Sequence, residues 1–496
     1  MSRWRSVRAD LIAGGVPLTH GAEIMNICLL SNNYRTMFFE KIGRGLERKG
    51  VGVVWIAASR RWADALIKAG WRRDRILCLA DFRDEWRSAP PPDPADPALT
   101  ELEAGGQSAN ETILMDRTLS RRPYAKAYLA VVAREVSRFL KAHDVRATFG
   151  EQTWAYELAT ALLCKAQGRA YFAPSTVRVP SDRFGFFTDL NQAEIFELRK
   201  PDRSDREAAE GIIEALRTRA YRPYYFHIQN KIRFFRSHWL GESVVQAFSR
   251  ATDGDETLPP LAQRSRFRFR RIVNTYRTRW QKPFESENLP GARPFVLVTL
   301  HMQPEASIDV FAHRNSDQIE NIRALSRVIP HGWEIYVKEH SNAIGFRTPR
   351  TYDELRRIPG VRLIDPYADT FKLMEASRLV LSPSGTVCLE AGLLGLKAAT
   401  FAPMYFAPVM SPGRIDLPAL TRTGFERLLQ RDDREGGAEP AAFLGWLHAQ
   451  SFPGRVGDPV HDPHSMTEEN VAIVVDGFAT LLHALETRRQ PNASAA

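Results

Sequence analysis

Three short segments decide the fold of this chain: FVLVTLHMQPEAS (residues 295–307), WEIYVKEH (333–340) and LVLSPSGTVCLEAGLLG (379–395). Each segment begins with an apolar, strand-like run and then breaks into polar residues. Helix-period patterns separate the segments, so the sequence predicts βαβ units on a parallel sheet. Because open α/β sheets bind ligands at the carboxyl ends of their strands, we expect the three polar breaks to meet at one binding site.

The N-terminal part of the chain repeats this alternation. Strand-like runs occur at 26–31, 52–57, 75–79, 145–149 and 170–173, and the pattern predicts an α/β protein with two Rossmann-like domains. We expect five regions: a disordered tail or over-long start (1–24), an N-terminal Rossmann-like domain (25–177), a helical insertion or linker rich in arginine and aromatic residues (178–294), a C-terminal Rossmann-like domain (295–466), and a C-terminal helix and tail (467–496).

The bulk properties are those of a globular protein with more than one domain. The chain has 496 residues, of which 44% are hydrophobic and 25% charged, and it contains no apolar run long enough to span a bilayer. The first residues lack the apolar core and cleavage site of a secretory signal, so we expect a cytoplasmic protein. The four cysteines are scattered in apolar runs without metal-ligand spacing, which predicts buried thiols and no bound metal.

The net charge of +10 is concentrated in the insertion. Basic and large aromatic residues alternate at 221–239 and again at 264–280, within a region that spans 221–282. Such a surface suits anionic lipid headgroups. The simpler interpretation is a solvated helix face whose arginine stems cover apolar neighbours. Nucleic-acid binding is not expected, because no nucleic-acid-binding motif accompanies the charge.

Ser384, Gly385 and Thr386 lie between a predicted strand and a predicted helix. Glycine lets the backbone approach a ligand, and the N–H groups at a helix start favour an anion such as phosphate. Glu390, one turn into the helix, is placed to accept hydrogen bonds from a ribose. The structural alternative is a plain helix cap followed by a solvent-facing glutamate.

Two further strand ends carry candidate site residues. Lys338 and His340 follow one strand, where they can neutralise a nucleotide phosphate, although a structural histidine is the simpler interpretation. Gln303 and Glu305 follow another strand, in a loop that a proline makes rigid. Glu305 is the expected base or nucleophile of a sugar transfer, with Gln303 as a donor contact. Glu151, at an N-terminal strand end, is the expected second acid/base group, unless it only pairs with an arginine.

At LHMQPEAS (300–307), WEIYVKEH (333–340) and SPSGTVCLEAGLLG (382–395) the sequence resembles the bacterial capsular-polysaccharide biosynthesis proteins, the superfamily that includes the retaining β-Kdo transferases. The resemblance implies a GT-B fold, in which two Rossmann-like domains face a cleft. It implies a metal-independent glycosyltransferase without a cofactor, working in the cytoplasm at the inner membrane on a lipid-linked or glycan acceptor. The donor that it implies is a nucleotide sugar such as CMP-Kdo or another ulosonic acid.

The same resemblance implies roles for individual residues. Lys338 and His340 would contact the donor phosphate or carboxylate, residues 384–386 would hold the nucleotide, and Glu390 would bind its ribose. Glu305 falls where the family's strand-end acidic residue is expected. One departure follows His340: many relatives have a His-Pro pair there, and this chain has serine at the next position.

Two other functions fit part of the pattern. Non-hydrolysing UDP-sugar 2-epimerases also use two such domains, a Ser-Gly loop and acidic residues, but they need neither an acceptor nor a basic aromatic insertion. A non-catalytic component of a capsule assembly or export complex is the alternative from another class. Such a protein would tolerate the loss of the phosphate-binding groups, because it catalyses no reaction. The same fold can serve either function.

Overall fold

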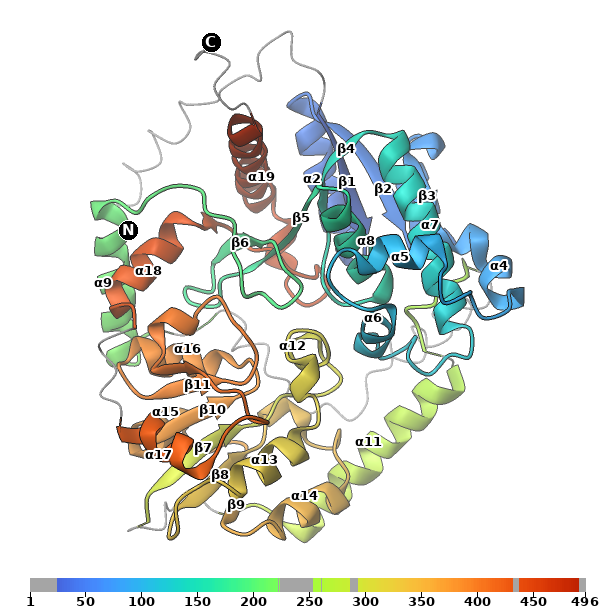
Figure 1. Cartoon of the computed structure of the whole chain (residues 1–496). Helices are drawn as coiled ribbons and strands as arrows, with labels where there is room; N and C mark the ends of the chain where they lie inside the picture. The colour runs from blue at the N-terminus through green and yellow to red at the C-terminus, as the bar shows by residue number, and fades with distance from the viewer. Residues whose placement is uncertain are drawn as a thin grey trace.

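The computed structural model describes residues 25–221, 223, 253–259, 261–285, 293–430 and 437–489. These residues form two α/β lobes, which lie one above the other in Figure 1. The expected tail at 1–24 lies outside the described residues, as does most of the basic stretch at 221–239.

The first lobe contains a seven-stranded sheet in the order β13-β6-β5-β4-β1-β2-β3. Its strands are β1 (Asn26–Ser31), β2 (Gly52–Ala57), β3 (Ile76–Cys78), β4 (Val145–Phe149), β5 (Ala170–Thr176), β6 (Arg183–Phe187) and β13 (Phe452–Pro453). Strands β1 to β5 pair in parallel in the order 3-2-1-4-5 of a Rossmann sheet. The prediction of a Rossmann-like N-terminal domain is confirmed.

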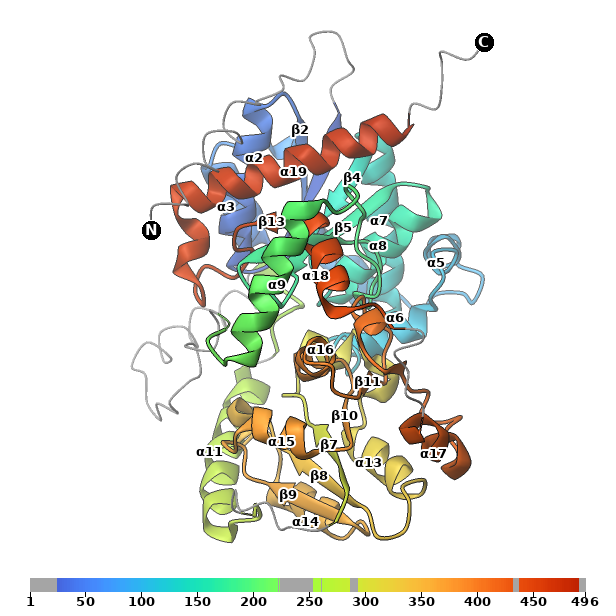
Figure 2. The same cartoon turned by 90° about the vertical axis from the view of Figure 1, so that its left-hand side faces the viewer.

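Helices cover both faces of this sheet (Figure 2). One face is covered by α2 (Arg35–Arg48) and the last helix, α19 (Glu468–Arg489), and the other by α7 (Ala125–Ala142) and α8 (Ala155–Ala166). Gly45 lets α2 and α19 pack closely, because a Cβ there would lie 2.4 Å from a methyl group of Val475. The other helices of this part of the chain are α3 (Arg60–Lys68), α4 (Arg83–Ser88), α5 (Pro97–Glu103) and α6 (Ala109–Met115).

The second lobe contains a six-stranded, wholly parallel sheet in the order β12-β11-β10-β7-β8-β9. Its strands are β7 (Phe295–Thr299), β8 (Glu334–Lys338), β9 (Val361–Ile364), β10 (Leu379–Ser382), β11 (Ala398–Thr400) and β12 (Pro412–Arg414). The order reverses between β7 and β10, which is the switch point at which such sheets bind ligands. Its helices are α12 (Ala306–Asp309), α13 (Gln318–Ser326), α14 (Pro349–Arg356), α15 (Thr370–Ala376), α16 (Thr386–Leu393) and α17 (Arg422–Gln430).

The limits of the lobes differ from the predicted domain limits. β6 falls in the region predicted to be helical (178–294), yet it extends the first sheet antiparallel to β5. β13 falls in the predicted C-terminal domain (295–466), yet it pairs with β6 in the first lobe. Just before it, α18 (Pro440–Ala449) packs against α9 (Arg203–Arg217). Both predicted limits were wrong. A short edge strand that pairs with a distant segment has too few residues to show the alternating hydrophobic pattern by which strands are predicted.

Another long helix of the insertion, α11 (Leu261–Gln281), lies along the second lobe in Figure 1 and contacts α14. Asn274 on this helix donates a hydrogen bond of 3.3 Å to the carbonyl oxygen of Gly345. Within the described parts of the chain, no helix is both long and apolar enough to cross a membrane. All four cysteines are buried and unpaired, as predicted.

The carboxyl ends of the two sheets face each other. Arg178, just after β5, donates a hydrogen bond of 2.7 Å to the carbonyl oxygen of Ser384, just after β10. The hydroxyl of Tyr405 in the second lobe donates to the carbonyl oxygen of Val177 in the first. Two Rossmann-like lobes that meet in this way form a GT-B-like architecture, as the sequence predicted.

Candidate functional site

The loops on the two sides of the switch point in the second sheet are in direct contact. His301 follows β7, and Ser384 follows β10. Nε2 of His301 lies 3.2 Å from the backbone nitrogen of Ser384 and 3.2 Å from Oγ of Ser382. The structure therefore brings the loop that carries Glu305 together with the Ser-Gly-Thr motif.

His301 is a site residue that the sequence analysis missed. The N–H of Ser384 donates to Nε2, so the proton of the neutral ring is assigned to Nδ1. Burial, together with the charges of Arg178, His340 and Arg347, lowers the pKa of His301 to about 3. The imidazole is therefore neutral near pH 7. The position of His301 directly after a buried strand was the one feature of the sequence that could have identified it as a site residue.

The loop after β7 is held by side chains of its own lobe. The carboxylate of Asp309 accepts hydrogen bonds of 3.0 Å from the backbone N–H of Glu305 and from Nε2 of Gln303. Gln318 donates to Oε1 of Gln303 at 3.2 Å and accepts from the N–H of His301 at 2.7 Å. Gln303, a predicted donor contact, is thus part of the scaffold that fixes this loop.

Glu305 sits at the start of α12 with a partly buried side chain. Burial raises the pKa of Glu305, although the charges of Arg178 and Arg117 oppose the shift. A carboxyl group whose pKa is raised keeps its proton to a higher pH than a free carboxyl group does, which favours acid/base chemistry. The geometry therefore suits the acid/base role predicted for Glu305.

Two arginines of the first lobe act on Glu305, and the sequence analysis missed both. Arg178 reaches across to Ser384, and its backbone has a left-handed φ of 67°. The guanidinium of Arg117 lies 4.6 Å from the ring centroid of Trp154. Both charges favour the ionised form of Glu305. A pair of guanidinium groups next to strand ends suits a phosphate or carboxylate ligand.

The Ser-Gly-Thr motif is only partly arranged as predicted. Ser384 is fully buried, and its hydroxyl donates a hydrogen bond of 2.6 Å to the carbonyl oxygen of Ser307. A Cβ on Gly385 would lie 2.5 Å from Oγ of Ser382, so glycine is needed here for close packing. The hydroxyl of Ser384 therefore joins two loops, and the start of α16 at Thr386 is the part suited to phosphate.

Glu390 lies on the first turns of α16 with a partly buried side chain. Burial raises the pKa of Glu390 to about 7, and its charge contributes to the raised pKa of Tyr221. The carboxylate of Glu390 is thus withdrawn from solvent, and no hydrogen bond to it is present among the described residues. The simple alternative of a solvent-facing glutamate is therefore wrong.

The Lys338-Glu339-His340 motif is divided between the lobe interior and its surface. Lys338 is 9% exposed, and its ammonium group donates a hydrogen bond of 2.7 Å to the carbonyl oxygen of Pro366. Burial lowers the pKa of Lys338. His340 is exposed, and its Nδ1 accepts from the N–H of Asn342 at 3.2 Å. Lys338 thus has a structural partner, whereas His340 remains accessible to a ligand.

Glu151 lies just after β4, at the switch point of the first sheet. Its carboxylate forms an ion pair with Arg35 and accepts a hydrogen bond from the amide of Asn32. The structure therefore has the arginine pairing that the sequence analysis gave as the alternative. Next to it, burial raises the pKa of Glu157, which accepts from the same Asn32 amide at 3.1 Å.

The described residues contain no group of three or more histidine, cysteine, aspartate or glutamate side chains that could hold a metal ion. The residues at the site are instead suited to binding an anion and moving a proton.

No protein-family model matches this chain, and no curated protein matches it. Three solved structures show its low similarity to known proteins. The S. aureus MnaA-UDP co-structure is 9% identical, with 93% of this chain and 98% of that chain covered and a TM-score of 0.27. KpsC of Thermosulfurimonas dismutans, a β Kdo 2,7 transferase, is 11% identical over 70% and 90%, with a TM-score of 0.35. A Methanocaldococcus jannaschii UDP-GlcNAc 2-epimerase in complex with UDP-GlcNAc and UDP is 11% identical over 85% and 98%, with a TM-score of 0.25. Similarity at this level carries no conclusion about activity.

Proposed function

We propose that this protein is a GT-B enzyme that acts on a nucleotide sugar, and that it transfers the sugar to an acceptor during biosynthesis of a capsule or related surface polysaccharide. One observation carries the proposal. Neutral His301, Glu305 with its raised pKa, and Arg178 of the opposite lobe lie together at the switch point of the second sheet. Doubly wound sheets bind their ligands at this position.

Each residue has a defined part in this proposal. Glu305 is the base or nucleophile of the transfer. Arg178 and the start of α16 at Thr386 bind the phosphate, and Glu390 binds the ribose. His340, exposed at the end of β8, contributes a further contact to the donor. His301 positions the two loops, because its ring accepts from the N–H of Ser384.

The proposed donor is a CMP-linked ulosonic acid such as CMP-Kdo. Such a donor carries a sugar carboxylate as well as a phosphate, so it presents two anionic groups. The first lobe supplies two guanidinium groups near Glu305, from Arg117 and Arg178. Two cations for two anions is an electrostatic match that suits this donor.

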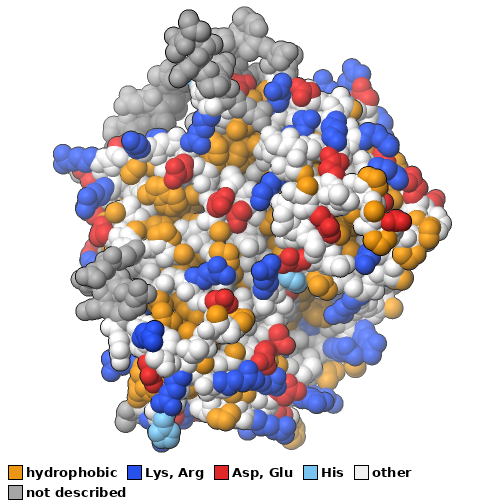
Figure 3. All heavy atoms as spheres, in the orientation of Figure 1, with side chains coloured by type: hydrophobic (Ala, Val, Ile, Leu, Met, Phe, Trp, Pro, Cys, Tyr) orange, Lys and Arg blue, Asp and Glu red, His pale blue; other side chains and the backbone are white. Residues whose placement is uncertain are grey.

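The proposed acceptor is lipid-linked, and the enzyme is proposed to work in the cytoplasm at an anionic membrane surface. On the view of Figure 3 basic and acidic side chains are interspersed, so net charge alone does not define a membrane face. The supporting feature is α11, on which Phe269, Tyr276 and Trp280 are exposed at helical spacing. Exposed arginines such as Arg270 and Arg277 lie between them. Aromatic residues among arginines suit an interfacial helix.

Calorimetric titration of CMP, UDP and GDP tests the nucleotide site. We expect one of these nucleotides to bind, and we expect Arg178→Ala to weaken its binding by about tenfold or more, because a charge-assisted hydrogen bond is lost. Arg203→Ala is the matched control, since the side chain of Arg203 is 93% exposed on α9. Failure of all three nucleotides to bind would sink the proposal.

A 2-epimerase is the second candidate, because the raised pKa values of Glu305 and Glu390 also suit a reaction that moves protons on the sugar. Incubation with UDP-GlcNAc alone separates the two functions. An epimer formed without any acceptor would favour the epimerase, whereas the transferase needs a second substrate.

A further inference from the structure

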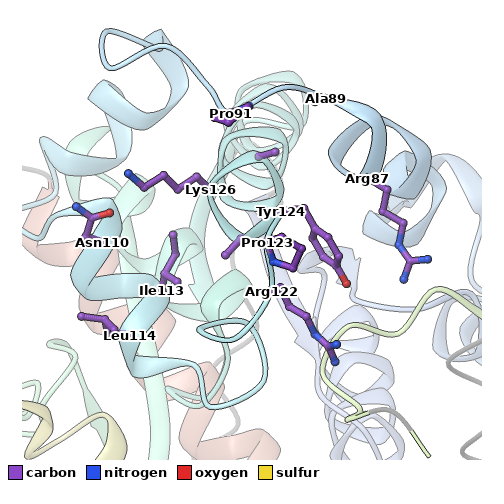
Figure 4. Close-up of a pocket in the computed structure, with 12 residues that line it drawn as sticks. Arg87, Ala89, Pro91, Asn110, Ile113, Leu114, Arg122, Pro123, Tyr124 and Lys126 are labelled. Carbon is purple, nitrogen blue, oxygen red and sulfur yellow. The ribbon is translucent and has the colours of Figure 1, made fainter.

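A cavity of about 760 Å³ lies beside α6 and α7 in the first lobe, and it shares no lining residue with the His301–Glu305 site (Figure 4). Its lining combines two kinds of side chain. Arg87, Arg122 and Lys126 are basic, whereas Ile113, Leu114 and Pro123 are among the apolar residues. A wall that is cationic in one part and apolar in another suits an amphiphilic anion.

The positive charge of this cavity is only partly balanced by the described residues. Arg87 is paired with Glu256 at 2.8 Å. Arg122 has no carboxylate partner within the described part of the chain, and its Nε and Nη2 are buried without any hydrogen bond. Buried N–H groups that lack a partner cost free energy, and a guanidinium is well shaped for phosphate. A phosphate bound in the cavity would place a negative charge beside this guanidinium.

The apolar part of the wall is open to solvent. Leu114 at the end of α6 is 60% exposed, although Ile113 beside it is 8% exposed. Figure 4 shows Ile113 and Leu114 on one side of Pro123, with Tyr124 and Arg122 on the other. An acyl or isoprenoid chain lying over Leu114 would remove this apolar surface from water.

The cavity is connected to α11. Tyr124 and Arg87 donate hydrogen bonds of 2.8 Å to the two carboxylate oxygens of Glu256. Glu256 belongs to the segment that precedes α11 in the chain. These hydrogen bonds therefore connect the cavity wall to the segment that leads into α11, the helix with the exposed aromatic side chains. A ligand with its chain in a membrane and its phosphate in the cavity is consistent with this arrangement.

We propose that the α6–α7 cavity binds a phosphate ester that carries an apolar chain. Arg122 lies beside the phosphate, and Ile113 and Leu114 contact the chain. Identifying this ligand as the lipid-linked acceptor rests on the proposed function, but the binding itself does not.

Calorimetry with the full chain tests this site. The probes are dihexanoyl phosphatidic acid, which has both phosphate and chains, glycerol 3-phosphate, which has no chain, and dihexanoyl phosphatidylcholine, whose phosphate is masked by a cation. The variants are Arg122→Ala and Leu114→Glu. Arg121→Ala is the matched control, because Arg121 is exposed and does not line the cavity.

We expect dihexanoyl phosphatidic acid to bind about tenfold or more tightly than either other probe. We expect Arg122→Ala and Leu114→Glu each to weaken it by about tenfold, with no change for Arg121→Ala. The exposed side chain of Leu114 makes its replacement compatible with folding. Equal binding of glycerol 3-phosphate, or binding that neither variant weakens, overturns the proposal. The nucleotide affinity of the same variants is measured as well. It should be unchanged, because the variants alter only the α6–α7 cavity, so a failure of this proposal can be told apart from a failure of the proposed function.

Discussion

His301 and Ser384 are 83 positions apart in the chain, and Nε2 of His301 lies 3.2 Å from the backbone nitrogen of Ser384. The first lobe has a similar contact at its own switch point, where Asn32 after β1 donates to Glu151 after β4. In both sheets a polar side chain thus bridges the two strands between which the strand order reverses. The bridge in the second lobe depends on a neutral imidazole, because a protonated ring could not accept the N–H of Ser384.

This dependence predicts a specific effect of pH on stability. The pKa of His301 is lowered from 6.5 to about 3 in the folded protein, so the unfolded chain binds the proton more readily. The contribution to stability is complete above pH 6.5 and is lost as the pH falls towards 3. Between pH 7 and pH 5 we expect His301 to account for a loss of up to about 2 kcal/mol.

Urea unfolding of wild type and His301→Asn at pH 7 and pH 5 measures this effect. The loss of stability between the two pH values should be smaller in the variant than in wild type. His331→Asn is the control, because His331 is exposed in the turn before β8. An equal pH response of His301→Asn and wild type would show that the imidazole is not held neutral by the fold.

Glu305→Gln should remove the proton-exchanging group and leave the loop in place. The backbone N–H of Glu305, not its side chain, is held by Asp309. We expect turnover of CMP-Kdo, measured as release of free CMP, to fall by about 10²–10⁴-fold with little change in CMP affinity. Glu320→Gln, on the exposed surface of α13, is the control. Full turnover by Glu305→Gln would mean that the catalytic assignment is wrong.

The sequence predicted most strands of both sheets, because each of these is a short apolar run with a polar break after it, whereas the short strands β6, β11, β12 and β13 were missed. The predicted ranges 26–31, 52–57 and 145–149 coincide with β1, β2 and β4. The polar breaks after β7 and β10 also meet as expected, because the positions of parallel strands fix where their carboxyl ends lie.

The partners of individual polar side chains could not be predicted in the same way. Ser384 binds the carbonyl oxygen of Ser307, and Lys338 binds that of Pro366. These partners come from loops whose packing has no periodic signal in the sequence. Arg178 was missed for a related reason, since it lies in the region predicted to be an insertion and reaches the site only because the lobes meet.

Replacing both Phe269 and Trp280 by serine should weaken membrane binding. Their side chains are 68% and 88% exposed on α11, so the change should leave the lobe folded. We expect co-sedimentation with vesicles containing phosphatidylglycerol to fall by about fivefold or more, because two aromatic rings no longer enter the interface. Tyr367→Ser is the control, since Tyr367 is 66% exposed elsewhere on the second lobe. Binding that is insensitive to the double change, or to added salt, would argue against α11 as the membrane face.

Glu339→Gln should destabilise the second lobe far more than the loss of an ordinary surface ion pair. The carboxylate of Glu339 is 1% exposed and receives hydrogen bonds of 2.6 and 2.7 Å from Arg347 and one of 3.0 Å from Tyr352. Without its charge, the guanidinium of Arg347 is left buried and uncompensated, and such a loss costs about 3–5 kcal/mol. Arg347 also donates to the carbonyl oxygen of His301 at 2.6 Å, so the loop after β7 should loosen as well.

Glu354→Gln is the matched control for this change, because its pair with Arg350 is exposed and lies within one helix. Its loss should cost about 0.5 kcal/mol or less. Thermal and urea unfolding of the two variants measures the difference, and nucleotide titration reports whether the loosened loop also weakens the site. Similar unfolding midpoints for both variants would show that the Glu339–Arg347 pair does not stabilise the loop after β7. The hydrogen bond between His301 and Ser384 would then be held in place by other contacts.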